Sequence, residues 1–100
     1  MQELLDWQAR GEPFQLIDVR EPHEYETANI GAELSPLGLV ATSADRISRD
    51  AKVVVHCRSG VRSAKAIREL EEKFGFDNLY NLKGGILAYQ EAIQHLWNAM

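Results

Sequence analysis

The feature that most constrains this chain is a short apolar run, residues 52–57, which ends in the chain's single cysteine, Cys57. Three consecutive valines within it favour a strand buried on both faces, as in a parallel sheet. Residues 58–60 predict a tight loop ending in glycine. Residues 61–74 repeat apolar side chains every three or four positions before Gly75, which predicts a helix. The run therefore predicts a strand–loop–helix unit with Cys57 at the carboxyl end of its strand.

The remaining elements are predicted to alternate between helix and strand. They are a helix over 1–10, a strand over 14–20, a helix over 22–28, a strand over 33–37, a helix over 43–47, a strand over 79–82 and a helix over 86–97. Such alternation predicts an α/β fold with a central, mostly parallel sheet flanked by helices. Ligands of such sheets bind at the carboxyl ends of the strands, where Cys57 falls. The length of 100 residues predicts one domain over 1–100.

The helix after Cys57 is predicted to be amphipathic. Its apolar positions, which we expect to face the core, are Val61, Ala64, Ile67, Leu70 and Phe74. No internal repeat or low-complexity segment interrupts the pattern.

Charge and cysteine content narrow the classes of function. The net charge of −4 and the absence of a basic stripe argue against a nucleic-acid partner. One cysteine excludes an intrachain disulfide and a zinc site built from several thiolates, and we expect neither a metal nor another cofactor. No signal peptide or apolar span of about 18 residues is recognisable, so we expect no membrane association. Together these features predict a reducing, cytoplasmic location.

Three effects converge on the sulfur of Cys57. The start of the following helix presents unpaired N–H groups and a favourable dipole. Gly60 permits a positive φ, so the loop amides can turn inward as an anion-binding nest. Arg58 and Arg62 add positive charge. Each effect favours thiolate over thiol, which predicts a nucleophilic cysteine rather than an inert core one.

The neighbours of Cys57 have competing interpretations. Arg62 either binds an anionic substrate or caps the loop, and its place at the loop rim favours substrate binding. Ser59 and Ser63 either hydrogen-bond the sulfur or cap the helix. His56 precedes Cys57 in the strand, so we expect it to face the other way and to be structural.

Two residues at the end of the preceding strand, Asp18 and Arg20, are candidate supporting residues of the site. The competing interpretation, which we favour, is that they pair with neighbours, for example Arg20 with Glu24.

Three stretches together resemble the rhodanese family: residues 16–21 (LIDVRE), 57–63 (CRSGVRS) and 81–86 (NLKGGI). The resemblance spans residues 16–89. It implies an α/β domain with a catalytic Cys57 that cycles between thiol and persulfide. It also implies an active-site loop formed by Arg58, Ser59, Gly60, Val61, Arg62 and Ser63, whose backbone amides hold the sulfur.

A narrower resemblance involves residues 28–37 (ANIGAELSPL) together with the other motifs. It is to the C-terminal rhodanese domain of E1-like adenylyltransferases of molybdopterin and thiamine synthesis or tRNA thiolation. This resemblance implies a ubiquitin-like sulfur-carrier protein as partner, and a chain that is either a stand-alone protein or a domain of a larger one. Two departures stand out: Tyr89 replaces a frequent tryptophan, and the short strand usually found before the first helix has no room here.

The predicted activity is therefore sulfur transfer of the thiosulfate sulfurtransferase type. Cys57 would take a sulfane sulfur from thiosulfate or a donor persulfide and pass it to a thiol, cyanide or a carrier protein. A cysteine phosphatase is a rival, but its loop has five residues between cysteine and arginine, whereas four separate Cys57 from Arg62. A non-catalytic binding module is the other alternative. A dithiol oxidoreductase is disfavoured because a second cysteine is absent.

Overall fold

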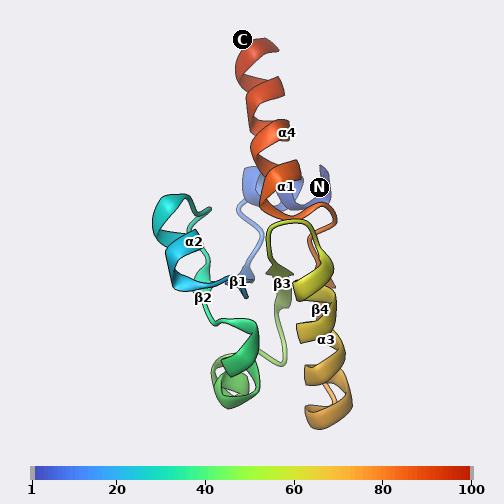
Figure 1. Ribbon diagram of the computed structural model, residues 1–100. Helices are drawn as coiled ribbons and strands as arrows, with labels where there is room; N and C mark the ends of the chain where they lie inside the picture. The colour runs from blue at the N-terminus through green and yellow to red at the C-terminus, as the bar shows by residue number, and fades with distance from the viewer. Residues whose placement is uncertain (1, 100) are drawn as a thin grey trace.

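The computed structural model describes residues 2–99, with side-chain surroundings for 3–95 and 98, and has helices around a four-stranded sheet (Figure 1). The elements are α1 (Gln2–Arg10), β1 (Phe14–Asp18), α2 (Pro22–Thr27), β2 (Glu33–Leu34), the 3₁₀ segment η1 (Leu37–Arg46), β3 (Lys52–His56), α3 (Val61–Phe74), β4 (Leu79–Asn81) and α4 (Gly85–Ala99). No helix in this described part is long and apolar enough to cross a membrane.

The sheet has the order β2-β1-β3-β4, and every neighbouring pair is parallel. The α/β fold with a parallel sheet is as predicted. The three valines of β3 are fully buried and alternate between two apolar clusters. Val53 and Val55 pack with α3 and η1, whereas Val54 packs with Trp7 of α1. Each such side chain contributes about 1.5–3 kcal/mol of burial, so β3 anchors both faces of the sheet.

Two segments between β1 and β3 differ from the prediction. β2 is only two residues long, because Pro36 follows shortly and has no N–H to continue the ladder. The chain nevertheless stays attached to the end of β1, since Ser35 N–H donates to Asp18 O at 2.8 Å. The predicted helix over 43–47 is part of η1, which already begins at Leu37.

Helix α3 has the predicted bounds, but its buried face is rotated from the predicted one. Ser63, Ala66 and Leu70 are buried, whereas Val61 is 63% exposed and Ala64 and Phe74 also reach solvent. The prediction was wrong at these three positions. The contact of Ser63 with the end of β3, and not the largest apolar stripe, sets the orientation of the first turn. Val61 is thereby left exposed on the loop around Cys57.

Candidate active site

The candidate site lies where the parallel strands β1 and β3 end. Asp18 pairs with His56 in the ladder, so Cys57 follows β3 at the edge where β1 also ends. The loop from β3 to α3 is placed between α2 and the beginning of α4 (Figure 1). Hydrogen bonds from α4 and an ion pair from α2 both reach this loop. The site therefore combines one loop with the starts of two helices distant in sequence.

Hydrogen-bond donors surround the sulfur of Cys57, which is 1% exposed. Gly60 N–H donates to Cys57 Sγ at 3.1 Å, and Ser63 Oγ lies 3.4 Å from the same sulfur. Gly60 has a φ of 111°, in the left-handed region that favours glycine, and directly precedes α3. This backbone conformation turns the loop amides towards the sulfur and places it at a helix N-terminus.

These donors lower the pKa of Cys57 below its ordinary value. Burial is the largest single effect and acts the other way, because it disfavours the charged thiolate. The Ser63 hydroxyl and the backbone N–H groups of Ser63, Gly60 and Ser59 together outweigh it. Ser59 therefore acts through its backbone, while Ser63 also uses its side chain. The arrangement favours a nucleophilic thiolate.

Asn81, at the end of β4, supports the loop and escaped the sequence analysis as an individual residue. Ser63 Oγ lies 2.5 Å from Asn81 Oδ1, to which its hydroxyl donates when it is not turned towards the sulfur, and Asn81 Nδ2 donates to Gly60 O at 3.1 Å. One side chain thus links the end of the loop to the first turn of α3. Its position at the carboxyl end of a strand beside β3 was the available signal.

The start of α4 holds the loop from the opposite side. Ile86 N–H donates to Cys57 O at 2.9 Å, and Leu87 N–H donates to Arg58 O at 3.3 Å. Gly85 has a φ of +60°, and a Cβ there would overlap the backbone carbonyls of Cys57 and Arg58. Close backbone approach explains why this position needs glycine.

Arg62 makes a two-pronged ion pair with Glu24 of α2. Arg62 Nη1 donates to Glu24 Oε1 at 2.6 Å, and Nη2 donates to Oε2 at 2.9 Å. The Arg62 hydrogen bond, helped by Glu21 N–H and opposed by burial, lowers the pKa of Glu24 to about 2. The sequence favoured Arg62 as a ligand for the donor, whereas its guanidinium here has a protein carboxylate as partner. Glu24 was considered only as a partner for Arg20.

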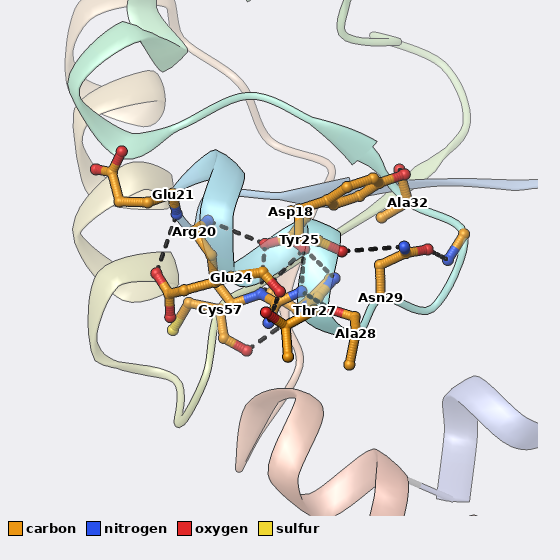
Figure 2. Close-up of polar contacts among 12 residues, drawn as sticks. Asp18, Arg20, Glu21, Glu24, Tyr25, Thr27, Ala28, Asn29, Ala32 and Cys57 are labelled. Atoms are coloured by element: carbon orange, nitrogen blue, oxygen red, sulfur yellow. Dashed lines mark hydrogen bonds and ion pairs between the residues drawn. The ribbon is translucent and has the colours of Figure 1, made fainter.

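Asp18 and Arg20 form a separate, buried ion pair next to the loop (Figure 2). Arg20 Nε and Nη2 donate to the Asp18 carboxylate at 3.0 and 2.8 Å, and Nη2 also donates to Ala28 O at 2.7 Å. The predicted pairing of Arg20 with the Glu24 carboxylate is wrong: Arg20 reaches only the Glu24 backbone oxygen, at 3.5 Å. One residue, Val19, separates Asp18 from Arg20, so the arginine folds back onto the strand end.

His56 contacts this pair and not the sulfur. Its Nε2 lies 3.6 Å from Asp18 Oδ2, and Nδ1 lies 3.3 Å from Cys57 O. Burial is the main reason that the pKa of His56 is lowered, although Asp18 opposes the shift. A neutral, buried imidazole in this position orders the strand ends, in line with a structural role.

A shallow pocket of about 270 Å³ opens beside the loop. Its lining includes Arg58, His23, Glu24, Leu87 and Gln90, so α2, the loop and α4 all contribute. Among residues 2–99, no group of three or more His, Cys, Asp or Glu side chains is arranged to hold a metal ion.

Comparison with known proteins agrees with this geometry. Residues 1–92 match the family model of the rhodanese-like domain. The chain belongs to the rhodanese-like domain family. This confirms the family resemblance found in the sequence, and the relatives below support sulfur transfer as the general activity.

Two relatives and one solved structure illustrate the match. The probable adenylyltransferase/sulfurtransferase MoeZ of Mycobacterium tuberculosis is 38% identical over 95 residues, which cover 92% of this rhodanese-like chain and 24% of MoeZ. A sulfurtransferase of Allochromatium vinosum is 37% identical over 74% of this chain and 69% of its own length. A rhodanese-like domain protein of Staphylococcus aureus superposes with a TM-score of 0.80 at 30% identity, covering 88% and 85% of the two chains. The chain thus spans about a quarter of the length of MoeZ.

Proposed function

We propose that this rhodanese-like domain, residues 1–100, is a sulfurtransferase in which Cys57 carries the transferred sulfur as a persulfide. The observation that carries the proposal is the contact of Cys57 Sγ with Gly60 N–H and with the Ser63 hydroxyl. These donors favour the thiolate that attacks and suit the negative charge that develops in transfer. The lone thiol and its persulfide suit a reducing cytoplasm.

The reaction has two half-reactions. In the first, the Cys57 thiolate attacks the outer sulfur of thiosulfate or of a donor persulfide. A new S–S bond forms, and sulfite or the donor thiolate leaves with the electron pair of the broken bond. In the second, a thiol or cyanide attacks the terminal sulfur and releases the Cys57 thiolate. With a sulfur-carrier protein, the persulfide would instead attack an activated C-terminal acyl group and expel its activating group. Two external thiols would then reduce the acyl disulfide, which releases the carrier thiocarboxylate and the Cys57 thiolate and leaves a disulfide of the two thiols. An external acceptor is required because the chain has no second cysteine.

The geometry supports sulfur transfer better than phosphoryl transfer. Four residues separate Cys57 from Arg62, and Arg62 is held by Glu24 instead of facing an open cradle. A phosphoryl group needs several free donors and a cation for its three equatorial oxygens. The sulfur of Cys57 is 1% exposed, which suits the transfer of a single sulfur atom.

The test is the intact mass of the protein after incubation with thiosulfate and, separately, with a small-thiol persulfide. We expect wild type to gain the mass of one sulfur atom and to lose it on addition of cyanide or a thiol. Cys57→Ser should keep the fold and gain nothing. Sulfur bound to Cys57→Ser, or no adduct on wild type with either donor, would contradict the proposal.

A further inference from the structure

We propose that Glu24 is a positioning residue that selects sulfur donors by charge, disfavouring the thiosulfate dianion relative to singly charged persulfides. It does so by balancing Arg62 at the rim of the Cys57 loop. This inference rests on the proposed sulfur transfer at Cys57 and assigns its class of donor.

The Glu24 carboxylate is held firmly towards Arg62. Both of its oxygens accept from the guanidinium, and Oε1 also accepts from Glu21 N–H at 3.0 Å. Helix α2 is itself anchored, because the buried Arg20 donates to Ala28 O just after the helix. The Arg62–Glu24 contact is therefore built into the fold, in contrast to a chance meeting of two long side chains.

The pair changes the charge that an incoming anion meets. Arg20 is matched by Asp18 and Arg62 by Glu24, whereas Arg58 has no ion-pair partner among residues 2–99. Arg62 lies close enough to Cys57 for the two charges to interact. An incoming donor therefore meets one unpaired cation, Arg58, whereas without Glu24 it would also meet an unpaired Arg62.

Electrostatics then discriminates between donors by their charge. Removing the negative charge that is paired with Arg62 should favour a monoanion about threefold and a dianion about tenfold, since the energy scales with the donor's charge. With thiosulfate, the thiolate and a dianion give a persulfide anion and the sulfite dianion. With methanethiosulfonate, the thiolate and a monoanion give the same persulfide anion and methanesulfinate. Sulfur moves and charge balances in both reactions.

The first experiment measures the charge at Cys57 without sulfur transfer. Cys57 is alkylated with iodoacetate, which is an anion, and separately with iodoacetamide, which is neutral. The rate constant for iodoacetate is divided by the rate constant for iodoacetamide. The ratio cancels any change in the thiolate fraction. Glu24→Gln should raise it about threefold. Glu26→Gln removes the same charge from an exposed position of α2 and should leave the ratio unchanged. An unchanged ratio in Glu24→Gln, or a Cys57 that neither reagent reaches, would overturn the proposal.

The second experiment measures donor choice. Persulfide formation is followed with thiosulfate and with methanethiosulfonate, and kcat/KM is compared. Glu24→Gln should raise kcat/KM for thiosulfate about threefold more than kcat/KM for methanethiosulfonate, chiefly by lowering KM. Equal effects on both donors would overturn the selection. If wild type takes sulfur from neither donor, the proposed sulfur transfer itself fails, and the alkylation ratio still reports separately on the charge at Cys57.

A second variant separates charge from structure. Glu24→Asp keeps the negative charge and should retain the wild-type preference between the two donors, even if the shorter side chain weakens the ion pair. Arg58→Gln removes the unmatched cation and should lower the iodoacetate-to-iodoacetamide ratio. A Glu24→Asp variant that behaves like Glu24→Gln would show a purely structural effect and overturn the charge argument.

Discussion

The loop around Cys57 and the helix α2 that faces it are held by different kinds of interaction. The loop is shaped by neutral groups: Gly60 N–H, the Asn81 side chain and the backbone N–H groups that open α4. Helix α2 and the segment before it are held by charge, through the pairs Asp18–Arg20 and Glu24–Arg62. The two regions meet at Arg62, which lies in the first turn of α3 next to the loop and pairs with α2.

The difference separates the shape of the site from its charge. Neutral backbone hydrogen bonds do not titrate, so the geometry around the sulfur should persist over a wide pH range. The ion pairs depend on pH and salt, and they determine what approaches the sulfur. Substitutions in the loop should therefore lower the free energy of unfolding or raise the pKa of Cys57. Changes to α2 should alter pH dependence and donor preference.

The largest effect is expected where the loop meets α4. Gly85→Ala should destabilise the protein by about 2–4 kcal/mol, because a Cβ would overlap the carbonyls of Cys57 and Arg58 at a positive φ. Chemical denaturation measures the loss. Gly38→Ala is the matched control, since its Cβ would meet no atom within 4 Å. Similar losses in both variants would show that the close approach at Gly85 is unimportant.

A smaller effect is expected on the thiolate. Ser63→Ala should raise the pKa of Cys57, because the Ser63 hydroxyl is the largest of the contributions that lower it. Alkylation of Cys57 by iodoacetamide should then reach half its maximal rate at higher pH and be severalfold slower at neutral pH. Ser59→Ala should behave like wild type, since only the Ser59 backbone N–H acts on the sulfur. Matching pH profiles for Ser63→Ala and wild type would refute this assignment.

The smallest effect should come from the ion pair. The folded state lowers the pKa of Glu24 from 4.5 to about 2, so it binds this proton less readily than the unfolded state. The pair therefore contributes stability above about pH 4.5, and the contribution is lost as pH falls towards 2. After allowance for solvent screening we expect about 1–2 kcal/mol at pH 6.

Denaturation of wild type and Glu24→Gln at several pH values tests this expectation. The difference in unfolding free energy between them should shrink as the pH falls below 4.5. The exposed variant Glu26→Gln serves as the control for a general change in net charge. A difference that is constant from pH 6 to pH 2.5 would mean that the effect of Glu24 does not come from its charge.

Sequence patterns were sufficient for the strand before Cys57 and for the bounds of α3, because local rules govern both. Three valines indicate a doubly buried strand, and Gly75 ends the helix in a left-handed conformation. The rotation of α3 was missed, since it depends on the contact of Ser63 with a residue outside the helix. The partner of Arg20 was missed because several carboxylates lie near it in sequence. The partner of Arg62 was missed because Glu24 is 38 residues away.

What the sequence by itself determined is the reactive atom and its immediate loop: one cysteine after a buried strand, followed by Gly60 and a helix. These features are contiguous, and short-range backbone geometry brings their N–H groups to the sulfur. Only the tertiary structure decided what surrounds that loop. Asn81, Gly85 and Glu24 come from three separate segments and meet it only because parallel strands end at one edge of the sheet. An ion pair 38 residues apart in sequence depends on the fold that brings its charges together.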